Sequence, residues 1–289
     1  MTATLTDPTT VTPVIPVTRS GTRRRPPVGL LVGTGLLLLL VVFSFVGPLL
    51  RPFDAYASDS TPLTGPNAIN WLGTDDLGRD VFVRLAVAAR ASLVVSFFAA
   101  VIAAAAGTLV GLVAGLWGRW ADAGLMAGVE ILLALPSILL ALCAVTVFGG
   151  SVLTVTLVLA LVALPQFARL VRSRSLELRE LDFVHSARVS GIPLLRIALR
   201  HLLPNTFGVI AVQFANTAAI SILLEASLSY LGLSVQPPTP SWGRMIYDAQ
   251  TYMSTTPWLA VAPLGTILML SIGWGLVGES LSARRRSLI

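Results

Sequence analysis

The chain has 289 residues, of which 55% are hydrophobic and only 12% are charged, whereas roughly 25% charged residues are typical of soluble domains. This composition excludes an ordinary soluble protein and predicts an integral membrane protein with about six spanning helices. All 20 cationic residues behind the net charge of +6 are arginines, and they cluster beside apolar stretches. That distribution favours orientation in a membrane over binding of nucleic acid.

The N-terminal residues 1–27 are rich in Thr, Pro and Val without periodicity, which predicts a disordered cytoplasmic tail. Six apolar stretches follow, and each is expected to cross about 30 Å of hydrocarbon as a helix. They run from Val28 to Leu50, Leu93 to Leu116, Leu125 to Phe148, Val152 to Leu170, Phe207 to Leu228 and Leu259 to Leu281. A cleaved signal peptide is the alternative for the first stretch, but its apolar core exceeds the usual roughly 7 to 15 residues. The sequence therefore predicts an all-α fold.

The arginines also predict an orientation. With residues 1–27 in the cytoplasm, fifteen of the 20 arginines lie on the cytoplasmic side of the six spans, as the positive-inside rule requires. Both termini are then cytoplasmic, including a basic tail at 282–289, and residues 51–92 and 229–257 are external. The remaining five spans form a core within 93–281. Trp242 and other aromatic residues in the second external segment are interpreted as anchors at the membrane interface.

The cytoplasmic loop 172–203 is unusually long and basic. Its residues 181–190 are compatible with a short helix that Gly191 would end, since glycine tolerates the left-handed cap conformation. A turn at Pro193 and a second helix would lead back to the membrane, where Pro204 opens the next span at a position that needs no N–H donor. Such a protrusion has too few apolar residues to be a domain, so it is expected to dock into a partner. The alternative is a solvated loop that serves only membrane orientation.

Three stretches of the sequence resemble permease subunits of binding-protein-dependent ABC importers. The spacings from Ala187 to Gly191 and from Gly191 to Leu203 and Pro204 are similar to those of the cytoplasmic motif of these permeases, which begins Glu-Ala-Ala and ends Leu-Pro. Two external stretches resemble the second, C-type permease of the peptide/nickel subgroup. These stretches contain Asp75, Asp76, Gly78, Arg79 and Asp80 in the first and Trp242 in the second.

This resemblance implies a type I ABC importer permease with six transmembrane helices in the cell membrane. It implies as partners a second homologous permease subunit, two ATP-binding subunits and an extracytoplasmic solute-binding protein. The permease would bind no cofactor and perform no catalysis, because the ATPase subunits would hold ATP and Mg. The absence of lysine agrees with this, since a Walker-type loop requires one. The implied cargo is a di- or oligopeptide, with nickel or a metal chelate as the alternative.

In the family that the motif resembles, the short cytoplasmic helix inserts into a groove of the ATPase. The resemblance therefore implies a coupling role for a set of loop residues. The set comprises His185, Ser186, Ala187, Arg188, Gly191, Leu203 and Pro204. The sequence departs from the family at His185, where the motif has glutamate. A histidine can change its charge near neutral pH, which would make this contact with the ATPase sensitive to pH. The favoured alternative is a neutral polar substitute that packs or donates one hydrogen bond.

Glu130 and Glu225 are the conspicuous acidic residues deep within the predicted spans. Because a charge near the bilayer centre costs at least ~2.5 kcal/mol, such residues are functional candidates. A gating or structural role is favoured over contact with the substrate. No series of acidic residues continues from either one, so a proton relay, and with it a secondary transporter or channel, is the weaker hypothesis.

No metal site is predicted. The external Asp75, Asp76 and Asp80 lack the alternating spacing and the final glutamate of a calcium loop, and a turn with Asp80 as a helix N-cap is favoured. A single cysteine, Cys143, excludes a cysteine cage. A stripe of small residues, Gly107, Gly111 and Gly115, predicts close packing of the second span against another helix.

Overall fold

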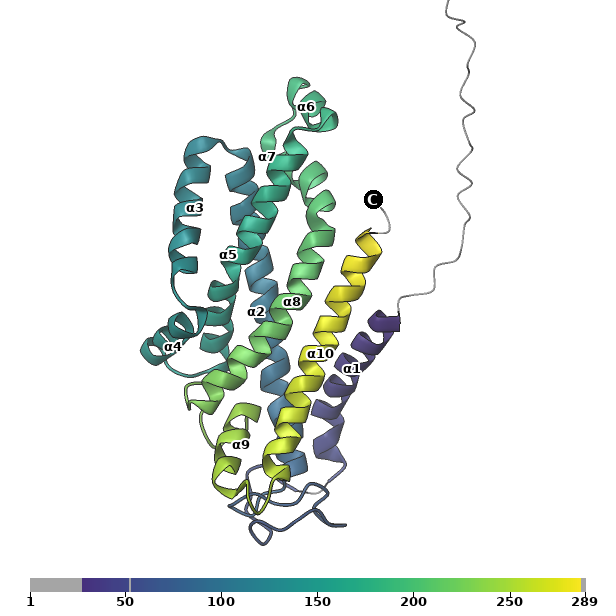
Figure 1. Ribbon diagram of the computed structural model, residues 1–289, viewed down its shortest axis with the longest axis vertical. Coiled ribbons are helices and arrows are strands. Elements are labelled where there is room, and N and C mark those ends of the chain that lie inside the picture. The colour runs from purple at the N-terminus through teal and green to yellow at the C-terminus, as the bar shows by residue number, and fades with distance from the viewer. Residues whose placement is uncertain (1–27, 52, 287–289) are drawn as a thin grey trace, which may run out of the picture.

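The computed structural model describes residues 28–51 and 53–286, so the expected tail 1–27 and the final residues 287–289 lie outside the described part. In that part the chain is almost entirely helical, and the long helices run side by side in one bundle (Figure 1). The α-helices are α1 Val28–Val46, α2 Val81–Leu116, α3 Arg119–Ala134, α4 Ser137–Phe148, α5 Val152–Arg179, α6 Asp182–Val189, α7 Leu194–Ile197, α8 Leu203–Tyr230, α9 Trp242–Ala249 and α10 Trp258–Arg286. Two short 3₁₀ turns, Gly47–Leu49 and Gln250–Tyr252, follow α1 and α9, and a π turn, Ala198–Leu202, joins α7 to α8.

Five helical segments of the described residues are long and apolar enough to cross a membrane, and a bent pair can supply a sixth span. The five segments are Val28–Leu49, Val81–Leu116, Val152–Arg179, Leu194–Tyr230 and Trp258–Arg284, and the bent pair is Arg119–Ala134 with Ser137–Phe148. The prediction of an all-α membrane protein with six apolar stretches is therefore confirmed.

The second span begins earlier than the apolar pattern suggested. The helix α2 starts at Val81, whereas hydropathy placed the membrane boundary near Leu93. The Asp80 carboxylate accepts a hydrogen bond from the Val83 amide at 2.9 Å, as the predicted N-cap does. The last part of the expected external segment 51–92 is therefore helical, and α2 extends for 36 residues.

The third span was wrongly predicted as one straight helix. It consists of α3 and α4, whose axes differ by 91°. The break lies at Leu135, whose backbone is extended with φ −91° and ψ 134°. The following Pro136 explains this conformation, because the proline ring excludes the helical region for the residue before it.

Two other boundaries move outward. The helix α5 continues to Arg179, nine residues past the predicted end at Leu170, so it includes the first part of the expected loop 172–203. The last helix continues to Arg286, so most of the expected tail 282–289 is helical. Both extensions contain arginines. Arginines lower the local hydropathy and so mark the end of an apolar stretch, but they do not disfavour a helix.

The centre of the bundle is the contact between α2 and α5. The stripe Gly107, Gly111 and Gly115 of α2 lies directly against the backbone of α5, where a Cβ at Gly107 would be only 2.7 Å from the Leu164 carbonyl oxygen. The predicted close packing is confirmed. The helix α8 packs against both α2 and α5, while α10 joins α8 to α1 at one flank and α3 with α4 forms the other (Figure 1).

The connections separate into two ends. The short helices α6 and α7 lie at the same end of the bundle as the last turn of α10, while α9 and the segment between α1 and α2 lie at the opposite end (Figure 1). This arrangement is the one that six alternating crossings require.

Replacing Gly111 with alanine should force α2 and α5 apart, because a Cβ there would lie 2.6 Å from the Ala168 carbonyl oxygen and 2.8 Å from Val171 Cβ. We expect the free energy of unfolding to fall by about 1–3 kcal/mol, seen as a lower Tm of the full-length protein in detergent. Gly128→Ala in α3 is the matched control, since a Cβ at Gly128 meets nothing within 4 Å. Equal changes in Tm for the two variants would contradict this assignment.

Candidate functional site

The candidate coupling residues form a protrusion made of α6 and α7. One side of α6 is packed against the bundle, where Val184 is fully buried and Ala187 is 8% exposed. They belong to a cluster of buried residues that includes Val171 and Leu178 of α5 and Ile197 at the end of α7. The protrusion is therefore held rigidly on the ends of two membrane helices.

The opposite side of the protrusion is open. His185 and Ser186 are exposed there, and three apolar side chains are also exposed, with Val189 at 77%, Leu195 at 60% and Leu181 at 46%. Apolar residues gathered on a small exposed surface typically mark a site of protein contact. This surface, defined by Leu181, His185, Val189 and Leu195, is called the α6 surface below.

Gly191 ends α6 with the geometry that the sequence predicted. Its φ is +74°, a left-handed conformation that costs other L-residues about 1–2 kcal/mol. The Ile192 amide donates to the Ala187 carbonyl at 3.1 Å, so the chain turns back on itself at once. Leu203 and Pro204 follow in the first turn of α8. The structure thus brings the predicted loop residues together at one end of the bundle; the side chain of Arg188 lies outside the described part.

The external motif forms a turn that closes the other end of the bundle. The Asp75 carboxylate accepts hydrogen bonds from the backbone amides of Leu77 and Arg79 and binds the Arg79 side chain at 2.7 Å. Gly78 supports the turn with φ +75°. The Asp75 oxygens are therefore used within the chain, in agreement with a turn rather than a calcium loop. No group of three or more metal-ligating side chains occurs among the described residues.

A buried arginine that the sequence reasoning missed connects this turn to the bundle. Arg84 of α2 is 4% exposed, lies 3.3 Å from Asp75 and donates to the Ala55 carbonyl at 3.0 Å. Local spacing did not point to this contact, because the residue one turn before Arg84 is Asp80, whereas the carboxylate that Arg84 meets is that of Asp75. Hydropathy alone assigned Arg84 to an exposed external segment.

Trp242 is not an interfacial anchor, contrary to the interpretation from sequence. Its side chain is fully buried, and its indole N–H donates to the Leu85 carbonyl at 3.1 Å. A tryptophan near the end of a span is typical of an anchor, but here the approach of α9 to α2 covers it completely. Trp242 instead fixes the position of α9 at the external end.

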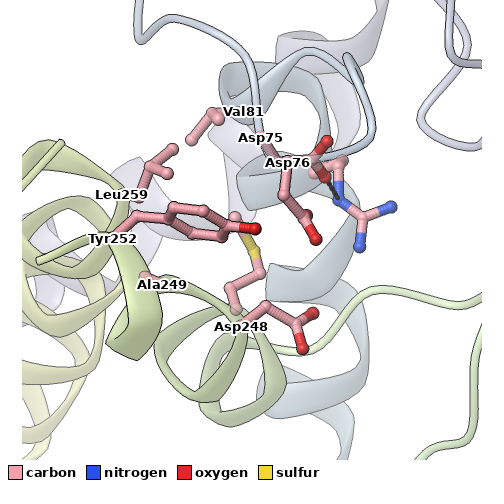
Figure 2. Close-up of a pocket in the computed structure, with 9 residues that line it drawn as sticks. Asp75, Asp76, Val81, Asp248, Ala249, Tyr252 and Leu259 are labelled. Atoms are coloured by element: carbon pink, nitrogen blue, oxygen red, sulfur yellow. Dashed lines mark ion pairs between the residues drawn. The ribbon is translucent and has the colours of Figure 1, made fainter. Parts of the chain in front are cut away.

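A small hollow lies between the external turn and α9. Figure 2 shows Asp76, Asp248 and the hydroxyl group of Tyr252 directed into the same space. Burial raises the pKa of the Asp248 carboxyl above its ordinary value, although the Arg244 guanidinium at 2.9 Å lowers it. This end of the bundle therefore presents acidic groups that are partly withdrawn from solvent.

Glu225 lies completely buried within α8. One carboxylate oxygen accepts a hydrogen bond from Ser92 of α2 at 3.1 Å, and the other accepts from Ser234, beyond the end of α8, at 3.2 Å. The glutamate therefore ties two spans to the segment that leads into α9. Of the two roles considered for Glu225, gating and structural, this arrangement supports the structural one.

Glu130 has a different environment. It is exposed on α3 and acts electrostatically on Arg172 of α5. Arg172 itself binds both oxygens of Asp122, with its Nη2 at 2.6 Å from Oδ2. Glu130 and Glu225 are therefore not parts of one site.

The comparisons with known proteins agree with the motifs. Residues 107–275 match the family described as binding-protein-dependent transport system inner membrane component. The chain is 39% identical over 255 residues to the dipeptide transport system permease protein DppC of Alkalihalophilus pseudofirmus. The matched region covers 88% of this chain and 83% of that protein. It is 38% identical over 253 residues to the glutathione transport system permease protein GsiD of Pectobacterium atrosepticum, with 86% and 84% covered. The corresponding protein of Escherichia coli O6:K15:H31 is 40% identical over 246 residues, with 84% and 81% covered.

Proposed function

Because the chain belongs to the family of binding-protein-dependent transport system inner membrane components, we propose that it is one of two permease subunits in an ATP-driven importer of di- or oligopeptides. It is a multi-pass protein of the cell membrane and serves as a transport subunit rather than an enzyme. The observation that carries the proposal is the agreement between the family match and the α6 surface, which the bundle holds rigidly and leaves open.

The names of the relatives favour peptides as cargo. One relative is named for dipeptide transport and two for glutathione transport, and glutathione is itself a small peptide. Neither name points to nickel, which was the alternative from sequence. The proposed cargo is therefore a short peptide, delivered by an extracytoplasmic solute-binding protein that meets the external end formed by α9 and the turn at Asp75.

ATP hydrolysis is assigned to two partner subunits, which would bind Mg and ATP and contact the α6 surface. Val184 and Ala187 join α6 to the ends of α5 and α8 through one buried cluster. A displacement of α6 by the ATPases is therefore passed directly to two spans. Rigid movement of the spans against those of a second, homologous permease would open the path alternately to the two sides of the membrane.

Transport of alanyl-alanine into proteoliposomes tests the proposed function. The complete importer, made of both permeases, both ATPases and the binding protein, should accumulate the peptide only when ATP is present on the cytoplasmic side. Omitting the binding protein should reduce uptake to background, and an ionophore should not. Uptake that needs no ATP and stops with the ionophore would identify a secondary transporter. Uptake of nickel ions in place of the peptide would identify the metal as the cargo.

The coupling role of the protrusion is tested at Gly191. Gly191→Val places a β-branched residue at φ +74°, which costs about 1–2 kcal/mol or more and should reduce coupled ATP hydrolysis and uptake together by roughly 5- to 30-fold. A Cβ at Gly191 meets nothing within 4 Å, so a steric clash is not the cause.

Gly191→Asn is the matched control, because asparagine adopts the left-handed conformation more readily, and it should retain most activity. Both variants should be present in the membrane at the wild-type level. Normal uptake by the valine variant would remove the assigned coupling role.

The proposed orientation, with both termini in the cytoplasm, is tested with single cysteines after Cys143→Ala. Ser58→Cys and Ser254→Cys lie at exposed positions of the external end, and Ala283→Cys lies at an exposed position near the end of α10. The first two should react with an impermeant thiol reagent in intact cells, and the third only after permeabilisation. The reverse pattern would invert the assigned sides of the membrane.

A further inference from the structure

A groove between α3, α5 and α8 has a polar wall although it lies along membrane helices. It has a volume of about 470 Å³, within the roughly 300–1,000 Å³ of pockets that hold small molecules. Its wall consists of Leu133, Gln166, Arg169, Leu170, Arg172, Ser173 and Gln213. Gln166, Arg169 and Ser173 follow one another at helical spacing on the same face of α5, so the polar character belongs to one continuous stripe.

Arg169 carries a charge that nothing in the described part of the chain neutralises. Its side chain is exposed, and no ion pair joins it to an acidic group of the described residues. Arg172, three residues later, contrasts with it, because Asp122 binds its guanidinium. Glu130 lies outside the wall of the groove. Arg169 is therefore the cation that this groove offers to a ligand.

The position of Arg169 along α5 restricts what it can face. It lies 17 residues after Val152, the external start of the helix, which is about 25 Å along the axis at 1.5 Å per residue. This places it in the cytoplasmic half of a hydrocarbon layer about 30 Å thick. At this depth the side chain is only about 5 Å from the cytoplasmic edge of the layer, so it reaches either the headgroups or a water-filled groove beside the helix.

Two amide side chains next to Arg169 are arranged to receive a peptide group. Gln213 of α8 donates to Gln166 of α5 at 2.8 Å and to Thr217 at 3.4 Å. These two bonds use the Gln213 amide nitrogen and the Gln166 oxygen, which leaves the Gln166 N–H groups as donors and the Gln213 oxygen as an acceptor. A peptide group needs one donor and one acceptor, so the pair is complementary to it.

A second, mainly apolar cavity adjoins the groove. This cavity of about 110 Å³ shares Gln166 with the groove and also has the hydroxyl groups of Ser137, Thr217 and Ser221. The rest of its wall consists of Leu159, Val162, Ala163, Ile220 and Leu224. Arg169 therefore belongs to the groove alone, and the second cavity offers hydroxyl groups in apolar surroundings.

From these contacts we propose that the groove is the cytoplasmic section of the translocation path and that Arg169 binds the C-terminal carboxylate of the peptide in transit. Gln166 and Gln213 bind the adjoining peptide group. The class of cargo in this inference rests on the proposed function. The site itself follows from the charge of Arg169 and the amide groups of Gln166 and Gln213. A guanidinium holds a carboxylate with two parallel hydrogen bonds, which gives both orientation and charge recognition.

The charge of the groove is measured with Ser173→Cys in the complete importer, after Cys143→Ala. An anionic methanethiosulfonate should react faster than a cationic one by roughly tenfold, relative to a free thiol, because a unit charge about 6 Å away in water speeds the anion and slows the cation by about threefold each. Arg169→Gln should abolish this preference, and Arg169→Lys should keep it. Ser254→Cys, at an exposed position near the opposite end of the bundle, is the control, and Arg169→Gln should not change its preference.

Recognition of the carboxylate is measured by protection of the same cysteine from the cytoplasmic side, which avoids the binding protein. Millimolar alanyl-alanine should slow labelling severalfold, while alanyl-alanine amide, which lacks the carboxylate, should not. Arg169→Gln should remove the protection and lower the maximal rate of uptake without changing its KM. Equal rates for the two reagents, or equal protection by the two peptides, would overturn the inference.

These results separate the site from the proposed function. If the importer accumulates alanyl-alanine but Ser173→Cys shows no charge preference, the groove is wrongly assigned and the proposed function stands. If the charge preference and the selective protection are both observed in an importer that accumulates no peptide, the groove binds carboxylates and the peptide cargo is wrong.

Discussion

The close approach of α2 and α5 is the contact on which the rest of the molecule depends. In lipid there is no hydrophobic driving force between helices, so association requires backbones that approach closely. Gly107, Gly111 and Gly115 provide that approach, with the α5 backbone where side chains would otherwise lie. These two helices then carry the functional ends, because α2 holds the external turn through Asp80 and Arg84 while α5 carries the protrusion and one wall of the groove.

Polar groups serve two different purposes in this bundle. Some bind one another across helices, such as Glu225 with Ser92 and Arg172 with Asp122. A polar group that is satisfied in this way adds stability and fixes the geometry. Others, such as Arg169 and Ser173, remain open along one stripe. The contrast between neighbouring residues on α5 separates the scaffold from the surface that can meet a ligand.

Much of the fold could be predicted from the sequence because the signals are local. Apolar length gave the six stretches, glycine spacing gave the helix contact, and Gly191 gave the end of α6. The proline at position 136 also indicated the break between α3 and α4, but the length of the apolar stretch alone suggested a single span. The interpretation of Trp242 as an interfacial anchor was wrong for a different reason. Its burial depends on contact with Leu85, which lies 157 residues away in the chain. The groove was missed similarly, because Gln166 and Gln213 meet only when α5 and α8 are packed together.

The length of α2 has a consequence for how the outer surface meets a soluble partner. Its 36 residues span about 54 Å, whereas a bilayer with its headgroups measures roughly 40–45 Å. If its inner end lies level with the inner headgroups, the helix rises about 10 Å above the outer ones even before any tilt is considered. The turn at Asp75 and the helix α9 are attached to this raised end. In the proposed orientation, and with the inner end at that level, they form a platform clear of the lipid on which a soluble protein can bind without displacing headgroups.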